Sequence, residues 1–321
     1  MRIDNKTLSE FICGAVRFET IDGYLVPRRF TEKQSENLRE NEFLDVRSRY
    51  SASIMLDFET DSQKISFEAY FLFSTRNYFA FDVYINEVLE YHFSGNGCKF
   101  GDKRKIEFNL PGGTNRVRIY FPCLFETGIS EFSIDNNALI VPTKKDKNFL
   151  FLGDSITNGQ LSKFSSYTYV NILSHSFNAN TLNQAICGGT FKASYIEETL
   201  PFTPDTIIVA YGTNDWWHGR DVSVIVKEYF DKLTSIYPQV PIFALLPIYR
   251  LDAEESHREV KIPFMDFREQ MKEFISEYHN VTVIDTINFV PHFADFYEDG
   301  YLHPNDMGYM KYAEHLKEYI C

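Results

Sequence analysis

The stretch Asn148-Phe149-Leu150-Phe151-Leu152-Gly153-Asp154-Ser155-Ile156 decides the fold class of this chain. An apolar run that ends in glycine is typical of a buried strand of a parallel sheet. Such a strand places the Ser155 hydroxyl at the C-terminal edge of the sheet, where open α/β folds bind their ligands. Gly153 removes a side chain where the backbone turns sharply and a substrate approaches. Taken alone, the Gly-Asp-Ser triplet also fits an ordinary turn that leads into a helix N-cap.

Two further segments favour the catalytic interpretation. Gly212-Thr213-Asn214-Asp215 follows a second apolar run at 206–211, and His303-Pro304-Asn305 lies near the C-terminus. A hydroxyl, a side-chain amide and an imidazole at or after strand ends are the parts that an acyl-transfer site requires. Their order and content resemble the SGNH (GDSL) family of serine esterases and lipases, in which four blocks contribute Ser, Gly, Asn and His in chain order.

The resemblance assigns one residue to each block. Ser155 matches the first, Asn214 the third and His303 the fourth, and Gly188 matches the second, with Gly189 as the near alternative. It implies that Ser155 is the nucleophile and that His303 takes and returns its proton. It also implies an oxyanion hole formed by the backbone N–H groups of Ser155 and Gly188 and the side-chain amide of Asn214.

The third member of a catalytic triad is where the chain departs from the family. The usual pattern places Asp three residues before the catalytic His, but Gly300 occupies that position and the carboxylate is Asp299, four residues before His303. Gly300 tolerates positive φ, so a tighter turn can absorb the extra residue and let Asp299 orient the imidazole. The alternative is a Ser-His dyad in which a backbone carbonyl orients the ring and Asp299 is solvated.

The first half of the chain has the pattern of β structure. Apolar and polar residues alternate with period 2 between residues 50 and 140, where no helical periodicity occurs. This pattern predicts an all-β, jelly-roll-like sandwich domain over residues 1–143. The segment Ala80-Phe81-Asp82-Val83-Tyr84 resembles, with two changes, a Gly-x-Asp-Leu-Tyr motif of the β-sandwich that precedes the catalytic domain in a bacterial branch of SGNH hydrolases, the carbohydrate acetylesterase-like branch. The alternating runs lie at 52–58, 65–71, 79–85 and 117–121.

After Pro142 the period changes, and strands alternate with amphipathic helices. This order predicts an α/β domain over residues 147–321, with a five-stranded parallel sheet covered by helices on both faces. The resemblance implies that this is a flavodoxin-like SGNH domain. No Gly-x-Gly-x-x-Gly or P-loop follows a strand, and no Gly-x-Ser-x-Gly elbow surrounds Ser155. The expected strands are 148–152, 180–184, 206–211, 241–246 and 281–285, and the expected helices cover 222–236, 264–278 and 310–320.

The composition indicates which classes of binding partner to expect. The 321 residues carry a formal net charge of −13, which favours neither nucleic acid nor an anionic membrane as a partner. The five cysteines, Cys13, Cys98, Cys123, Cys187 and Cys321, are widely spaced and include no C-x-x-C, so we expect neither a disulfide framework nor a metal site. No cofactor is expected. The N-terminus opens into no apolar h-region, and a cytoplasmic protein is the expectation.

The substrate is expected to be a small-molecule or oligosaccharide ester. The chain has no long apolar segment suited to an acyl-chain tunnel, and SGNH enzymes with an N-terminal sandwich resemble carbohydrate acetylesterases. The leading hypothesis is therefore hydrolysis of a short acyl ester, acetyl above all, through an acyl-enzyme on Ser155. Tyr211, Trp216 and Trp217 are candidate substrate-binding residues, although one Trp could instead pack under its loop and the other cap the domain interface. The alternatives are a lysophospholipase or thioesterase of the same mechanism, and an inactive carbohydrate-binding protein.

Overall fold

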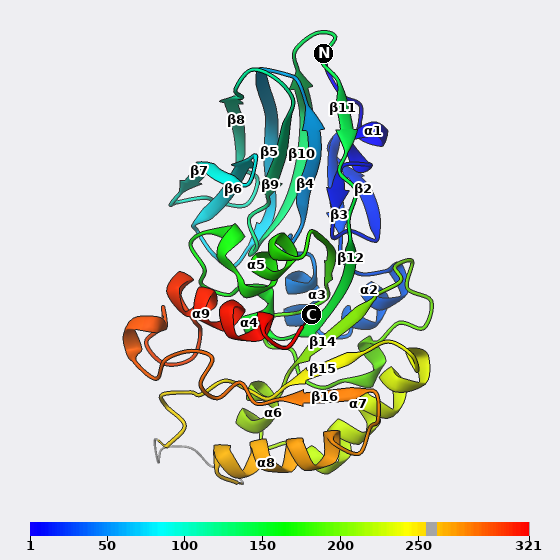
Figure 1. Ribbon diagram of the computed structural model, residues 1–321, viewed down its shortest axis with the longest axis vertical. Helices are drawn as coiled ribbons and strands as arrows, with labels where there is room; N and C mark the ends of the chain where they lie inside the picture. The colour runs from blue at the N-terminus through cyan, green and yellow to red at the C-terminus, as the bar shows by residue number, and fades with distance from the viewer. Residues whose placement is uncertain (255–261, 321) are drawn as a thin grey trace.

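The structure, a computed structural model, describes residues 1–254 and 262–320; Cys321, one of the five cysteines considered above, lies outside them. Figure 1 shows a β-sandwich at one end of the molecule and a parallel sheet flanked by helices at the other. The four described cysteines are free thiols. Among the described residues, no helix is both long and apolar enough to cross a lipid bilayer.

The sandwich consists of two antiparallel sheets whose inner faces share one apolar core. Ile65, Phe67, Ala69 and Phe71 point into this core and alternate with more exposed residues, as the period-2 pattern predicts. One sheet has the order β1 (Ile12–Cys13), β4 (Met55–Thr60), β9 (Asn115–Tyr120), β6 (Phe79–Ile85) and β7 (Val88–Gly95), with β11 (Ile140–Pro142) beside β4. The other has the order β2 (Arg17–Ile21), β3 (Tyr24–Arg28), β10 (Phe125–Ile134), β5 (Lys64–Ser74) and β8 (Lys103–Asn109).

The expected β structure of the first half is present, but the first fifty residues hold helices as well as β1, β2 and β3. The helices are α1 (Asn5–Ser9), α2 (Glu32–Leu38) and α3 (Glu42–Ser48). These helices are too short to show a 3.6-residue period and are defined by their caps instead. Thr31 and Gln34 form a reciprocal capping box at the start of α2, and the Asn41 side chain accepts the Leu44 N–H at the start of α3.

The second half forms the predicted five-stranded parallel sheet. Its order is β13 (Ala179–Asn183), β12 (Lys147–Gly153), β14 (Thr206–Ala210), β15 (Ile242–Leu245) and β16 (Val281–Ile284). α5 (Tyr169–Ser176) and α9 (Asp306–Lys317) pack on one face, and α7 (Val222–Ile236) and α8 (Phe264–Ile275) pack on the other (Figure 1). This is the flavodoxin-like order, so the strand order reverses between β12 and β14, which is where such sheets bind ligands.

The segment that joins the two halves is anchored on both sides. On the sandwich side, the Thr143 hydroxyl donates to Asp57 at 2.9 Å and Lys145 forms an ion pair with the same carboxylate. On the other side, the Asn178 amide donates to the Lys144 carbonyl at 3.0 Å. The connection between β11 and β12 is therefore held by side chains of both halves.

Candidate active site

Ser155 is the first residue of α4 (Ser155–Asn158), which is separated from β12 only by Asp154. Gly153, the last residue of β12, allows this sharp exit, because a Cβ there would lie 2.7 Å from the Thr157 Cβ of α4 and 3.0 Å from the Ala210 carbonyl oxygen of the neighbouring strand. The Asp154 carboxylate caps α4 by accepting the Ile156 N–H at 3.0 Å. Ser155 is 6% exposed, and its hydroxyl lies near the C-terminal end of β12.

His303 and Asp299 extend from Ser155 as a hydrogen-bonded chain. Ser155 Oγ lies 2.8 Å from His303 Nε2, and His303 Nδ1 lies 2.6 Å from Asp299 Oδ2. Gly300 adopts φ of +83°, which absorbs the additional residue between Asp299 and His303. The carboxylate therefore contacts the imidazole and is not simply solvated.

Asp299 is also held by its own loop. Its Oδ1 atom accepts the backbone N–H groups of Tyr301, Leu302 and His303 at 2.9–3.2 Å. Partial burial acts to raise the pKa of this carboxyl, but the hydrogen bonds from the His303 ring and from the Leu302 and His303 amides outweigh it and hold the pKa well below its usual range. Asp299 is thus a fixed anion that can stabilise a protonated His303.

Gly188 lies on the loop after β13, and Asn214 lies in the short helix that follows β14. Asn214 is the second residue of α6 (Thr213–Trp217), and its Nδ2 atom donates to the Gly189 carbonyl at 2.8 Å. This bond uses one of the two amide hydrogens, so the other can donate elsewhere. Gly188 is more exposed than Gly189, and its N–H has no acceptor among the residues that the structure describes. Ser155 begins a helix, where backbone N–H groups have no partner within the helix.

A buried carboxyl lies next to the nucleophile. Burial raises the pKa of the Asp154 carboxyl to about 7, and the nearby Asp215 acts in the same direction. Burial likewise raises the pKa of Asp215 to about 6, although Arg220 pairs with it at 2.7 Å. These two acids tie loops together, because Asp154 caps α4 and Asp215 accepts the Phe191 N–H.

The three aromatic residues predicted to bind substrate do not lie together on the surface. Tyr211 and Trp216 are packed in the core of the parallel-sheet half, 4% and 2% exposed, and Trp216 Nε1 donates to the Ile262 carbonyl. Neither can present a ring face to a substrate, so the platform interpretation does not fit them. Trp217 is 41% exposed, and the Arg250 guanidinium lies over its ring. Only Trp217 remains a candidate contact.

The N-terminal half supports the Gly188 loop, which the sequence did not indicate. The Arg29 guanidinium is buried and donates to the carbonyl groups of Asn183 and Ala185 on one side and of Ser48 and Tyr50 on the other. Burial lowers its pKa to about 9, so it stays charged at neutral pH. The sequence could not identify Arg29, because its partners are backbone carbonyl groups and no residue type marks their positions.

Gln34 makes a second connection between α2 and the same loop. Its side-chain amide exchanges hydrogen bonds with that of Gln184 at 3.0 and 2.9 Å and donates to the Tyr195 carbonyl. Both glutamine side chains are buried. The loop that carries Gly188 is therefore held by residues on both sides of the junction.

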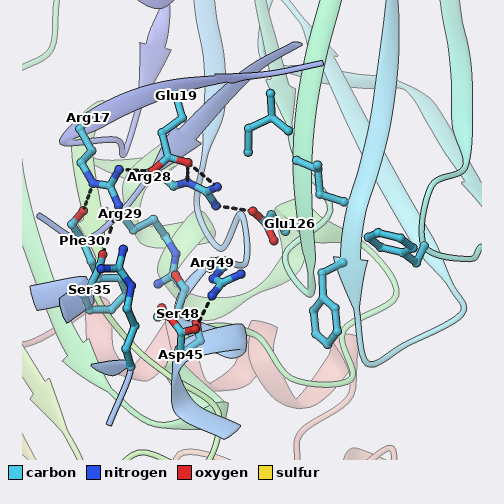
Figure 2. A pocket seen from close by; sticks show the side chains of 15 residues that line it. Arg17, Glu19, Arg28, Arg29, Phe30, Ser35, Asp45, Ser48, Arg49 and Glu126 are labelled. Atoms are coloured by element: carbon cyan, nitrogen blue, oxygen red, sulfur yellow. Dashed lines mark hydrogen bonds and ion pairs between the residues drawn. The ribbon is translucent and has the colours of Figure 1, made fainter. Parts of the chain in front are cut away.

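A cavity of about 470 Å³ lies between the sandwich and helices α2 and α3 (Figure 2). Its charged side chains are largely paired: Arg28 contacts Glu19 and Glu126, and Arg49 pairs with Asp45. Neither Ser155, Asn214 nor His303 is among the residues that line it. The acyl-transfer groups are therefore outside this cavity. The lining includes Arg17, Glu19, Arg28, Arg29, Phe30, Ser35, Asp45, Ser48, Arg49 and Glu126, which are labelled in Figure 2.

Comparisons with known proteins place this geometry in a family. Residues 151–311 match the model of the GDSL-like lipase/acylhydrolase family. No curated protein sequence matches the chain.

Several solved structures share the fold over most of the chain. The salicylyl-acyltransferase SsfX3 from a tetracycline biosynthetic pathway is 19% identical, with a TM-score of 0.83 over 96% of this chain and 93% of that chain. A GDSL-like lipase from Bacteroides ovatus is 16% identical, with a TM-score of 0.79 over 100% and 96%. A family two carbohydrate esterase from Clostridium thermocellum, solved in complex with cellohexaose, is 16% identical, with a TM-score of 0.59 over 83% and 91%.

The matched residues contain the Ser155, Gly188, Asn214 and His303 blocks on the flavodoxin-like sheet. The chain belongs to the GDSL-like lipase/acylhydrolase family and is an ester-hydrolysing enzyme.

Proposed function

We propose that the protein is a serine esterase that removes short acyl groups, acetyl above all, from a carbohydrate through an acyl-enzyme on Ser155. The observation that carries the proposal is the chain of contacts from Ser155 Oγ to His303 Nε2 at 2.8 Å and from His303 Nδ1 to Asp299 at 2.6 Å. Nucleophile, base and orienting carboxylate are within hydrogen-bond reach of one another, which is the arrangement that activates a serine.

The first half-reaction acylates the serine. His303 Nε2 takes the proton of Ser155 Oγ while that oxygen attacks the ester carbonyl carbon. The N–H groups of Ser155 and Gly188 and the amide of Asn214 are the donors for the resulting oxyanion. When the intermediate collapses, the C–O bond to the alcohol breaks and His303 returns the proton to the departing alcohol.

The second half-reaction repeats this chemistry with water. His303 takes a proton from water, the hydroxide oxygen attacks the acyl carbon, and the bond to Ser155 Oγ breaks as that oxygen regains the proton. A free carboxylic acid leaves, and its ionisation at neutral pH releases a proton. The Asp299 anion stabilises the protonated His303 in both halves.

Two observations support a short acyl group on a carbohydrate. The chain has no long apolar segment to enclose a fatty acyl chain, and the family two carbohydrate esterase that shares its fold was solved with cellohexaose. A lysophospholipase or thioesterase of the same mechanism would prefer long acyl chains or thioesters.

The test compares 4-nitrophenyl acetate with 4-nitrophenyl octanoate, followed by a panel of acetylated sugars. We expect a higher kcat/KM for the acetate ester, and a loss of kcat of roughly 10⁴–10⁶ in Ser155→Ala, because no activated nucleophile remains. Ser162→Ala serves as a matched control, since this nearby serine bonds Asp306 rather than His303. Wild-type turnover in Ser155→Ala would overturn the mechanism, and a preference for octanoate would overturn the short-acyl assignment.

A further inference from the structure

Helix α3 of the N-terminal half has two different faces. Asp45 and Ser48, together with Arg49 just after the helix, line the cavity in Figure 2. Phe43 and Arg47, four residues apart, lie on the same side of the helix. The Arg47 guanidinium carbon is 3.3 Å from the centroid of the Phe43 ring, and its Nη1 atom donates to the Phe43 carbonyl at 2.9 Å.

Phe43 contacts the Gly188 loop directly. A Cβ added to Gly188 would lie 2.6 Å from Phe43 Cε1, so the ring packs on the glycine itself. Phe43 is nevertheless half exposed, at 50%. An exposed ring with an arginine stacked on it therefore lies beside one of the candidate oxyanion donors.

Arg47 is positively charged, and no carboxylate in the described part of the chain pairs with it. Among the described residues, no Asp or Glu oxygen lies within 4.0 Å of its side-chain nitrogens, and the same holds for Arg76 in the turn between β5 and β6. This contrasts with the cavity in Figure 2, where Arg28 and Arg49 are paired with carboxylates.

The positive charges of these arginines also act on Cys187, the residue before Gly188. Burial raises the pKa of the Cys187 thiol to about 12, and Arg47, Arg29 and Arg76 all oppose that rise. Arg76 follows Thr75, whose hydroxyl lies 2.6 Å from the Tyr50 hydroxyl, and Tyr50 shares a buried cluster with Cys187. The N-terminal half therefore brings positive charge to the loop of Gly188.

We propose that the ester substrate carries a carboxylate, which binds the Arg47 guanidinium beside the Phe43 ring, with Arg76 adding to the attraction. This inference rests on the proposed esterase function and specifies its substrate as an anionic ester. A guanidinium binds a carboxylate through two parallel N–H···O bonds, and stacking on Phe43 holds its plane in place. The carboxylate belongs either to the acyl group or to the alcohol.

Two matched pairs of esters test the proposal and distinguish these sources. For the acyl side the pair is 4-nitrophenyl hemisuccinate and 4-nitrophenyl butyrate, and for the alcohol side it is an acetylated methyl glucuronide and the acetylated methyl glucoside. We expect wild-type kcat/KM to favour the charged member of one pair by about tenfold, the effect of one charge-assisted contact. The pair that shows the preference identifies the portion that binds Arg47.

Variants then assign the preference to Arg47. Arg47→Gln should bring the ratio of kcat/KM for the charged and neutral esters, both measured on that variant, close to one, and Arg47→Lys should retain part of the preference. Arg104→Gln is the control, because it removes the same charge from an exposed arginine that pairs with Asp102 on the sandwich. A preference that survives in Arg47→Gln, or that Arg104→Gln also removes, would overturn the proposal.

A measurement on the unmodified protein covers the case in which Arg47→Gln does not fold. The preference for the charged ester should fall between 0.05 and 0.5 M NaCl, roughly the range over which the Debye length drops below 10 Å. If the wild type hydrolyses neutral and charged esters equally at both salt concentrations, the carboxylate proposal fails and the esterase function stands. If it hydrolyses no ester at all, the proposed function itself fails.

Discussion

At the scale of single residues, Asp299 tests whether the site is a triad or a dyad. Asp299→Asn keeps an oxygen for the loop N–H groups but removes the anion that pairs with His303 Nδ1. We expect kcat to fall about 10³–10⁴-fold, because the imidazole loses its correct tautomer and the stabilisation of its protonated form. The measurement is steady-state hydrolysis of 4-nitrophenyl acetate.

The neighbouring acid provides the control for that variant. Glu298 is one residue from Asp299 and pairs with Lys163 at 2.8 Å, so Glu298→Gln removes the same charge without touching His303. Its kcat should change less than about twofold, as expected for a largely solvated ion pair. A loss of less than about tenfold in Asp299→Asn, with unfolding unchanged, would instead leave a Ser-His dyad.

Asp154 gives a prediction for stability rather than activity. Its folded-state pKa is raised to about 7 from an ordinary value of 3.8 by burial. As pH rises from about 4 to 7, the unfolded chain releases this proton and the folded chain keeps it, so the free energy of unfolding falls. A pKa difference of about 3 between the two states corresponds to a fall of up to roughly 4 kcal/mol. Below the ordinary pKa both states hold the proton and this penalty is absent.

Asp154→Asn should remove that contribution and keep the cap, because the Asn oxygen can still accept the Ile156 N–H. Urea unfolding at pH 4, 6 and 8 should show a free energy of unfolding that falls less with rising pH in the variant than in the wild type, and a more stable variant at pH 8. Equal pH dependence in the two proteins would show that Asp154 titrates normally in the folded state.

At the scale of elements, Arg250 fixes the helix that carries Asn214. It forms two bonds to Asp252 at 2.9 and 3.0 Å, donates to the Thr213 hydroxyl of α6 at 3.1 Å, and lies over the Trp216 and Trp217 rings. Arg250→Met should lower the free energy of unfolding by roughly 3 kcal/mol, because a buried carboxylate loses a bidentate partner. It should also lower kcat more than it raises KM, since α6 positions a donor for the oxyanion.

Arg250→Lys separates charge from geometry. Lysine keeps the positive charge but cannot form the same pair of parallel bonds, so its stability and kcat should fall between those of Arg250→Met and the wild type. Chemical unfolding and steady-state kinetics on the same preparations measure both. If Arg250→Met lost stability with an unchanged kcat, Arg250 would support the fold without positioning Asn214.

The elements that the sequence predicted are those defined by periodicity or by a motif on a strand end. The five parallel strands were found because apolar runs alternate with amphipathic helices. Ser155 and Asn214 lie just after two of these strands, β12 and β14, whereas His303 lies in the segment before α9. Helices α2 and α3 were missed because they are short. The only sequence signal for α2 was Thr31 followed three residues later by Gln34, which is the capping-box spacing.

The contacts around the site were less predictable than the site itself. Trp216 and Trp217 are adjacent in sequence, but only the packing of α6 makes one buried and the other exposed. Phe43 and Gly188 are far apart in the chain and meet through tertiary folding. Arg29 acts on backbone carbonyls, which every residue has. None of these relations depends on a local pattern, so no window of sequence could show them.

At the scale of the whole molecule, the interface between the halves predicts that the parallel-sheet half is weakened when it stands alone. A chain of residues 145–321 loses Arg29 and Gln34, and with them the partners of Asn183, Gln184 and Ala185. We expect a lower unfolding temperature and a kcat reduced by about 10², because small displacements near an active site cost that much. Circular dichroism and ester hydrolysis measure the two effects.

Adding back the missing half is the control. Residues 1–143, produced separately and mixed with residues 145–321, should restore part of the activity if the loss comes from missing contacts. A fragment of residues 145–321 that is folded and as active as the full chain would show that the N-terminal half neither supports the Gly188 loop nor contributes to catalysis.

The junction held by Asp57 and Asn178 has a consequence for how this protein evolves. Many multidomain proteins arise when one domain is exchanged for another by recombination at a loose linker. Here the joining segment is bonded to both halves, through Thr143 and Lys145 on one side and the Lys144 carbonyl on the other. A transplanted sandwich would lack these partners, so the two halves are expected to be inherited together and to change by compensating substitutions rather than by exchange.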